Sequence, residues 1–364
     1  MAITRLGPNQ DITAAKIAGQ INFKNLIING DMSVAQRGIQ TGVTTNTYGE
    51  PDRWLTALNT LGTWTISQDT DVPTGQGFAN SLKLDCTTAD ASPAAGDRIF
   101  LTQRLEGQML QSLKKGTSNA ESTTVSFWVK SNVTGTYILE LFDNDNTRQV
   151  SKTYTIDSAS TWEKKTITFD GDTTGTLDND NNASLYVQWW LGAGTNWTSG
   201  TASGSWATNT NANRAAGLTA NIGSDTANNF WITGAQLEAD TSDSDFEFLP
   251  YDVNLQRCYR YYEVLASGNG KTLGFGGAYN ANTPAFASYL HPKRATPSID
   301  QTSGTRYYRI YGNGVEYTWN AYSAFLQPTP TQVMFIGSGT IPQGLIGLFD
   351  TISGSSYIAY DAEL

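Results

Sequence analysis

Histidine, cysteine and charged residues are all scarce in this chain of 364 residues. There is one histidine, His291, so a histidine-based metal cluster is excluded. The two cysteines, Cys86 and Cys258, are too few for a disulfide framework, and we expect both to be buried free thiols. Charged residues make up 15% of the chain, against about 25% in an average soluble domain. This deficit disfavours long helices and coiled coils, which depend on Lys, Glu and Arg.

Charge and hydropathy exclude two classes of partner. The formal net charge of −10 argues against a nucleic-acid phosphate backbone as the partner. The chain has no run of about 18 apolar residues, so we predict no membrane span. The first residues have no apolar core of signal-peptide length, and we expect synthesis in a cytosol.

The charge is unevenly distributed along the chain. Residues 1–252 carry 16 basic and 27 acidic residues, whereas residues 253–364 carry 7 and 6, which predicts a domain boundary near residue 252.

Aromatic residues, Thr, Gly and Asn take the place of the missing charges and favour short strands with elaborate loops. Apolar and polar residues alternate in 81–86 and 124–130, as in half-buried strands. Other strands are expected at 26–28, 52–55, 64–66, 137–142, 162–169, 185–191 and 230–232. We predict an all-β fold whose main part is a two-sheet jelly-roll β-sandwich. Its one short helix is expected at 106–115, with Leu110 and Leu113 facing inward and Gly116 as the C-terminal stop.

The pattern divides the chain into four parts. Residues 1–24 are polar and form a short N-terminal arm, and residues 25–239 form the jelly roll. Residues 240–252 are an acidic linker, and residues 253–364 form a second, smaller C-terminal β-sandwich. One or two helical turns open this last part, because these residues follow a helical spacing: Leu255, Cys258, Tyr259 and Tyr262.

The C-terminal sandwich contains a hairpin signal and enough apolar residues for a core. Gly312, Asn313 and Gly314 separate the strands 306–311 and 315–319. The expected core residues are Phe275, Phe286, Tyr289, Ile299, Val333, Phe335, Ile346, Leu348 and Ile358.

Motifs of catalytic sites are missing from the chain. It has no Gly-x-Ser-x-Gly elbow, no P-loop and no dinucleotide fingerprint, and we predict no enzymatic activity. Asp178, Asp180 and Asn182 alternate like the first half of a calcium loop, although the glycine and the final glutamate of such a loop are missing. They are a candidate metal site, and a solvated acidic turn is the alternative interpretation.

Aromatic residues are the best candidates for a binding site, because Trp and Tyr rings cover the C–H face of a sugar. Trp197 and Trp206 lie in the long loop 192–217, where they either bind a carbohydrate or plug an open end of the sandwich. In the C-terminal hairpin, Tyr307, Arg309 and Tyr311 share one strand face. Ile310 marks the opposite face as the buried one, so these three form either an exposed receptor-binding strip or a trimer contact.

Residues 25–38, NLIINGDMSVAQRG, resemble the opening of a domain common in bacteriophage and prophage tail-fibre proteins. Similar motifs continue in the same order: DRW (52–54), SFWVKS (126–131), WEKKTIT (162–168), GDTTGT (171–176), LGAG (191–194), FWITGAQLE (230–238), FLPY (248–251) and QRCYRYY (256–262). Together they cover residues 25–262, whereas the C-terminal part matches loosely.

This family looks like the galactose-binding-like, carbohydrate-binding-module-like jelly rolls of secreted glycosidases, so the resemblance implies sugar binding. In those modules an acidic opening strand and a closing strand with two aspartates often hold a structural calcium. Here Asp31-Met32 and Thr233-Gly234 stand at those places, so most acidic ligands are missing. We therefore expect no cofactor, and a structural calcium is the alternative that the resemblance suggests.

The resemblance implies a non-enzymatic phage virion protein, assembled in the host cytoplasm. We expect a homotrimeric tail fibre that binds a host cell-surface glycan and is attached to the phage tail or head through residues 1–24. One alternative is a head fibre or capsid decoration protein with the same modules. A second alternative is the carbohydrate-binding module of a glycan-degrading enzyme.

Overall fold

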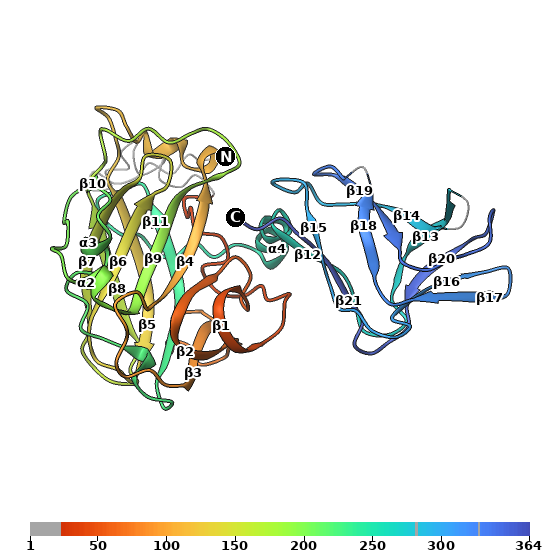
Figure 1. The fold of residues 1–364 in the computed structure, drawn as a ribbon. Coiled ribbons are helices and arrows are strands. Elements are labelled where there is room, and N and C mark those ends of the chain that lie inside the picture. The colour runs from red at the N-terminus through yellow and green to blue at the C-terminus, as the bar shows by residue number, and fades with distance from the viewer. Residues whose placement is uncertain (1–22, 281–282, 327) are drawn as a thin grey trace, which may run out of the picture.

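The computed structural model describes residues 23–280, 283–326 and 328–364 as two bodies built from β-strands (Figure 1). The first contains strands β1 to β11 in one hydrogen-bonded system, and the second contains a three-stranded and a seven-stranded sheet. The predicted all-β fold, a jelly-roll sandwich followed by a smaller β-sandwich, is therefore confirmed. Of the predicted N-terminal arm, residues 1–22 lie outside the described residues.

The jelly roll consists of two layers that share one long strand. Leu55–Thr60 of β2 (Leu55–Asp69) pairs with β4, whereas Thr63–Asp69 of the same strand pairs with β3. The first layer contains, in order, β10 (Ala207–Thr208), β7 (Arg148–Ile156), β6 (Gly135–Asp143), β9 (Ala183–Ala193) and β4 (Arg98–Glu106). The second contains β3 (Ser81–Thr88), β11 (Asn229–Glu238), β5 (Thr123–Ser131) and β8 (Glu163–Phe169), while β1 (Gln40–Tyr48) pairs with β2.

Large aromatic side chains fill the space between the two layers. Trp189 on β9 lies with its ring centroid 5.5 Å from that of Trp54 and 5.7 Å from that of Phe127. Its neighbour Trp190 points to the outer side of the same layer, because successive side chains of a strand face opposite ways. Cys86 lies in this core and Cys258 in a smaller cluster, and both are free thiols as predicted.

Two local predictions for the jelly roll are wrong, and a third is confirmed only in part. Residues 26–28 are buried but form no strand. Residues 64–66 lie in β2 as predicted, whereas of the segment 52–55 only Leu55 belongs to that strand. The helix predicted at 106–115 is replaced by the end of β4 and two 3₁₀ turns, η1 (Gly107–Met109) and η2 (Gln111–Leu113). A Cβ atom on Gly107 would lie 1.9 Å from the backbone oxygen of Asp178, so only glycine fits where the chain packs against this neighbouring loop.

Helix α4 (Tyr251–Tyr259) leads into the second body. The three-stranded sheet contains β12 (Tyr262–Ser267), β21 (Tyr357–Asp361) and β15 (Ser298–Gln301). The seven-stranded sheet contains, in order, β17 (Val315–Trp319), β16 (Tyr308–Gly312), β20 (Ile346–Thr351), β13 (Thr272–Tyr279), β14 (Thr283–Tyr289), β19 (Gln332–Gly337) and β18 (Tyr322–Leu326). The predicted hairpin is β16–β17, and Asn313 and Gly314 have the positive φ angles, 52° and 76°, of a tight turn.

Two residues expected in the core of the second body are exposed instead. Phe275 is 76% exposed and Ile346 is 74% exposed. A register shift between Thr272 and Gly274 separates buried Leu273 from Phe275, so the strict alternation that would bury both is broken. Phe286, Val333, Phe335 and Ile358 are buried as predicted, Ile299 and Leu348 are half-buried, and the side chain of Tyr289 lies outside the described residues.

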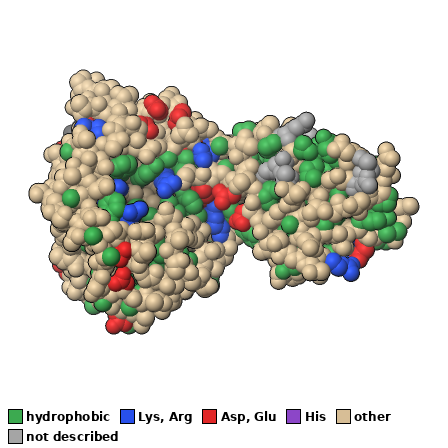
Figure 2. All heavy atoms as spheres, in the orientation of Figure 1, with side chains coloured by type: hydrophobic (Ala, Val, Ile, Leu, Met, Phe, Trp, Pro, Cys, Tyr) green, Lys and Arg blue, Asp and Glu red, His purple; other side chains and the backbone are tan. Residues whose placement is uncertain are grey.

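The two bodies meet through α4 and the C-terminal residues, which return to the jelly roll (Figure 1). Glu363 forms ion pairs with Arg53 and Arg37, and Figure 2 shows acidic and basic side chains gathered at this junction. The backbone oxygen of Leu364 accepts hydrogen bonds from Tyr48 Oη and Arg104 Nη1, both at 2.7 Å.

Among the described residues, no helix has both the length and the apolar character needed to cross a bilayer.

Candidate functional site

Trp197 and Trp206, the two predicted loop residues, are packed against the jelly roll. Trp197 lies in α2 (Thr195–Thr198), with its ring centroid 5.6 Å from that of Trp190, and its Nε1 donates to Gly96 O at 3.3 Å. Trp206 Nε1 donates to Asp170 O at 2.9 Å, and the Lys115 ammonium lies 4.5 Å from the Trp206 ring centroid. Both rings are half-buried, as the plug interpretation requires.

The loop that holds Trp197 covers the outer side of the β6–β9–β4 layer. Phe100, Ile138 and Trp190 on that side form a cluster with Ala215. Arg214, the last residue of α3 (Asn211–Arg214), donates to both carboxylate oxygens of Glu140, at 2.8 and 3.1 Å. The middle of this sheet face is therefore occupied by the protein itself.

The hairpin residues Tyr307, Arg309 and Tyr311 do not form a continuous open strip. Tyr308 and Ile310 face inward as predicted, and Tyr311 is 50% exposed. Arg309, however, donates two 2.8 Å hydrogen bonds to the carboxylate of Asp350 and also pairs with Glu316. Tyr307 packs against the core of the second body. Tyr311 is thus the most accessible of the three.

The acidic turn with Asp178, Asp180 and Asn182 is organised by its own hydrogen bonds. The Asp180 carboxylate accepts from Asn182 N at 2.9 Å and from the Asn182 side chain. Asp178 is exposed, and its backbone N–H donates to Asp145 Oδ2 at 2.9 Å. Within residues 23–280, 283–326 and 328–364, no group of three or more His, Cys, Asp or Glu side chains is arranged to hold a metal.

Three other tryptophans gather on the outer side of the second layer, and we call this surface the tryptophan face. It consists of Trp128 on β5, Trp231 on β11, and Trp162 directly before β8. Trp231 lies opposite Lys130 of β5, and Trp128 lies opposite Lys164 of β8. All three rings are half-buried, so each keeps part of its surface in contact with solvent.

Carboxylates and a lysine hold two of these rings in place. Trp162 Nε1 donates to Asp71 Oδ1 at 2.9 Å, and Trp231 Nε1 donates to Asp69 Oδ2 at 3.1 Å. The Lys130 ammonium lies 4.3 Å from the Trp231 ring centroid and 5.5 Å from that of Trp162, and it pairs with Asp71. Burial works to raise the pKa of Asp71, but the hydrogen bonds from Lys130 and Trp162 outweigh it and lower that pKa. The charged form of Asp71 therefore holds the Trp162 indole in place.

A pocket of about 270 Å³ lies beside Trp128. Its other walls come from segments far apart in the sequence: Gln76, Phe78, Ser126, Lys164, Gly234, Asp245, Phe246 and Phe248. The three phenylalanine rings contact one another with centroids 4.9 to 5.1 Å apart. Gly234 has φ +62°, and a Cβ atom there would lie 2.5 Å from the Phe78 ring, so the glycine makes room for this aromatic wall.

This combination of groups suits a carbohydrate. An indole covers the C–H face of a sugar ring, while hydroxyl, amide and charged side chains around it bind the sugar hydroxyls. The sequence patterns include Trp128, Trp162 and Trp231 only within family motifs and 240–252 as a linker, so they do not predict this candidate site. The alternation of Phe127 and Val129 with Trp128 and Lys130 was a usable signal, because it places the last two outside the core.

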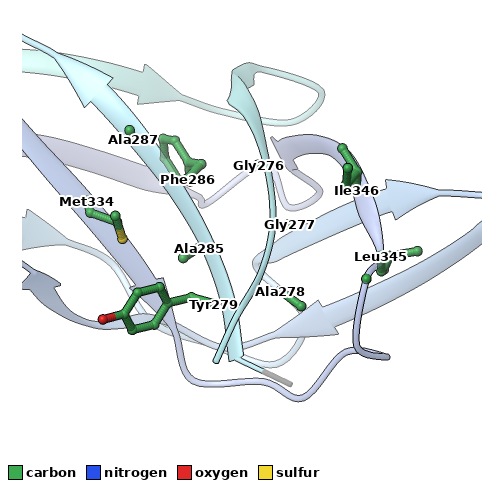
Figure 3. Close-up of a pocket in the computed structure, with 11 residues that line it drawn as sticks. Gly276, Gly277, Ala278, Tyr279, Ala285, Phe286, Ala287, Met334, Leu345 and Ile346 are labelled. Atoms are coloured by element: carbon green, nitrogen blue, oxygen red, sulfur yellow. The ribbon is translucent and has the colours of Figure 1, made fainter. Parts of the chain in front are cut away.

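A second, mainly apolar groove of about 370 Å³ crosses the outer face of the seven-stranded sheet (Figure 3). Small residues of β13 and β14, among them Gly277, Ala285 and Ala287, leave it open, and Met334 and Ile346 lie at its sides. Every described residue that lines it is glycine, alanine or a larger apolar or aromatic residue. It offers few groups that would bind sugar hydroxyls.

Neither a family model nor a curated protein matches this chain. Solved structures with partial similarity include the enzymatically active domain of tailspike protein 4 of bacteriophage CBA120 (13% identity, TM-score 0.29), for which the match covers 59% of this chain and 21% of the tailspike chain. A putative sugar binding protein from Bacteroides thetaiotaomicron has 15% identity and a TM-score of 0.33, with 59% of this chain and all of that chain covered.

A tandem pair of family 22 carbohydrate-binding modules from Paenibacillus barcinonensis has 10% identity and a TM-score of 0.27, with 91% and 99% of the chains covered. Identities and TM-scores in this range carry no argument about function. The resemblance to phage tail-fibre domains therefore rests on the sequence motifs alone.

Proposed function

We propose that this protein is a non-enzymatic, glycan-binding structural protein of a phage virion, with the tryptophan face of the jelly roll as its carbohydrate site. The observation that carries the proposal is the partly exposed Trp128 ring beside a pocket that also contains a lysine, a carboxylate and a hydroxyl group. An aromatic ring surrounded by side chains that form hydrogen bonds is a common arrangement in sugar-binding sites. The loop 192–217 covers the middle of the opposite sheet face.

The role in a phage virion is a second part of the proposal. The motifs in residues 25–262 support a tail fibre that is attached to the particle through residues 1–24 and assembled in the host cytoplasm. We propose a homotrimer, in which the exposed apolar face around Phe275 and Ile346 is buried between copies. Light scattering should give three times the chain mass of 39.5 kDa. A monomer at micromolar concentration would refute the trimer.

The binding proposal is tested with an array of bacterial surface polysaccharides and purified full-length protein. Trp128→Ala should weaken binding by about 5- to 150-fold, on the analogy of 1–3 kcal/mol per stacked aromatic ring. Tyr311→Ala, which removes an exposed aromatic ring from the hairpin, is the matched control and should bind like the parent. Binding that Tyr311→Ala abolishes and Trp128→Ala leaves intact would move the site to the hairpin. No binding to any polysaccharide would refute the glycan-binding proposal.

Attachment to the particle needs a separate test. Immunogold labelling of this protein on phage particles, seen by negative-stain electron microscopy, should mark the tail. Label on the head would favour a head fibre, and particles without label would contradict the virion role. Deletion of residues 1–24 should leave a folded protein that no longer joins particles.

A further inference from the structure

We propose that the pocket beside Trp128 binds a neutral sugar that carries an N-acetyl group. This inference rests on the proposed glycan-binding function and specifies the class of sugar for the same site. It depends on three properties of the pocket: an apolar wall in addition to the indole, polar groups suited to an amide, and a charge balance unfavourable to acidic sugars.

The pocket has more apolar surface than the C–H face of a plain hexose would cover. One aromatic ring is enough to cover the C–H face of a hexose, and Trp128 supplies it. The pocket also contains the cluster of Phe78, Phe246 and Phe248, and Phe248 is 49% exposed. A plain hexose would place hydroxyl groups or water against this wall. The methyl group of an acetamido substituent would instead be buried there.

The polar groups of the pocket match the two ends of an amide. An acetamido group has one N–H donor and one carbonyl acceptor. Asp245, at the exposed edge of the pocket, accepts hydrogen bonds, while the Ser126 hydroxyl and the Lys164 ammonium donate them. Ser126 is 4% exposed, so a bound carbonyl would meet its hydroxyl away from bulk water.

The charges disfavour an acidic sugar. Among the described residues that line the pocket, Lys164 is the one cation, and its Nζ lies 2.7 Å from Asp243 Oδ2. The hydrogen bond from Lys164 lowers the pKa of Asp243, so this partner stays ionised at neutral pH. Asp245 adds a second carboxylate. Lys24 is a nearby cation outside the pocket lining, and its Nζ donates to the backbone oxygen of Asp245 at 2.9 Å. A uronic acid or a phosphorylated sugar would approach the Asp243 and Asp245 carboxylates with Lys164 already paired, whereas a neutral sugar would not meet this repulsion.

The experiment compares matched probes that differ in the acetamido group. Oligosaccharides of N-acetylglucosamine and of N-acetylgalactosamine are titrated into the full-length protein by isothermal calorimetry, each beside the oligosaccharide of its parent hexose. At least one acetylated probe should bind roughly tenfold more tightly than its parent, from one buried methyl group and one additional hydrogen bond. A 6-deoxyhexose probe, which has a methyl group but no amide, should not reproduce this gain.

Variants then locate the preference. Phe248→Ala removes an exposed ring of the wall and should abolish the preference for the acetylated probe while Trp128 still supports weak binding of both. Tyr251→Ala is the control, since this 59% exposed aromatic residue does not line the pocket. Circular dichroism of both variants verifies that the fold is kept.

The outcomes separate the two proposals. Equal affinity for acetylated and parent sugars, or a preference that survives Phe248→Ala, overturns the N-acetyl inference and leaves glycan binding in place. Tighter binding of the 6-deoxyhexose than of the acetylated probe also overturns it. If Trp128→Ala affects no sugar on the polysaccharide array either, the tryptophan face is not a glycan site and both proposals fail.

Discussion

Asp172 holds together a buried charge network at one end of the jelly roll. Its carboxylate accepts hydrogen bonds from Arg148 Nε at 2.7 Å, Arg148 Nη2 at 2.9 Å, Lys115 Nζ at 3.0 Å and Thr174 Oγ1 at 2.9 Å. Lys115 also pairs with buried Asp143, and its ammonium lies against the ring of Trp206. The network thus fastens the loop of Trp206 and the 170–177 loop to β6 and β7.

Replacing the carboxylate by an amide, Asp172→Asn, should destabilise the jelly roll strongly. Removal of one partner from a buried ion pair costs about 3–5 kcal/mol, because the remaining charge stays desolvated. Asp143 still compensates Lys115 in the variant, and the Arg148 side chain is 18% exposed and gains some hydration. We therefore expect the lower end, about 3 kcal/mol, which corresponds to a decrease in Tm of about 6–12 °C for a domain of this size.

Urea unfolding followed by tryptophan fluorescence measures this change. Nine of the ten tryptophans precede residue 253, so the signal reports mainly on the jelly roll. Asp157→Asn is the matched control, because the Asp157 side chain is 71% exposed and its pair with Lys165 spans 3.4 Å. The control should change the free energy of unfolding by less than about 0.5 kcal/mol.

The pH dependence gives the reasoning a second test. Burial alone would raise the pKa of Asp172, but the hydrogen bonds from Arg148 and Lys115 outweigh it and hold this pKa far below the usual 3.8. A carboxyl with a lowered pKa in the folded state contributes stability above its unfolded pKa and loses it as the pH falls below that value. The stability gap between parent and variant should therefore be constant from neutral pH to about pH 5 and shrink below about pH 4. A gap that widens in acid, or a variant as stable as the control at neutral pH, would refute this account.

Three further predictions concern other parts of the molecule. Gly234→Ala should destabilise the jelly roll by about 1–3 kcal/mol in urea unfolding, because a Cβ atom at positive φ would displace the Phe78 ring; Gly204→Ala, with nothing within 4 Å of the added atom, should be neutral. Ile346→Ser should shift light scattering towards the monomer, because it places a hydroxyl group in the apolar face that the proposed trimer buries. The free energy of unfolding of the dissociated chain should change by less than about 0.5 kcal/mol, since Ile346 is 74% exposed in the single chain. Cys86 and Cys258 should resist alkylation in the folded protein and both react after unfolding without reductant, and a sulfur-linked peptide pair in the mass spectrum would contradict this.

Strands with one buried and one exposed face were predictable from the sequence. Residues 81–86 and 124–130 alternate in the sequence and lie in β3 and β5. The missed strands lack this signal for two physical reasons. β1 exposes most of its polar side chains, so it has almost no apolar pattern. β4 is apolar on both sides, because Ile99 faces the core while Phe100 is covered by the loop after β9.

The exposed position of Phe275 follows from a single irregularity that the sequence does not specify. One register shift near Gly274 moves the following side chains to the other face of the sheet. Gly274 is compatible with such a shift but also with a regular strand. Apolar character alone therefore assigned Phe275 and Ile346 to a core, whereas both side chains are exposed and Ile346 lines the apolar groove.

The pocket beside Trp128 was out of reach of local sequence patterns because the fold assembles it from separate segments. β5 lies next to β11, which brings Ser126 and Trp128 towards Gly234. The loop before β3 supplies Gln76 and Phe78, and the segment after β11 supplies the remaining rings. Each segment has an ordinary composition, and only the strand order makes them neighbours.

The segment after β11 links the pocket to the opening of the jelly roll. Glu247 accepts hydrogen bonds from the backbone N–H groups of Phe23, at 2.6 Å, and Asn25, at 2.9 Å. Its neighbours Phe246 and Phe248 contact Phe78 in the pocket wall. Glu247 therefore anchors residues 246–248 to the start of the jelly roll. Phe246 and Phe248 in the same segment form part of the pocket wall. An acidic segment that looks like a solvated connection in the sequence thus has a structural reason for both its charge and its aromatic residues.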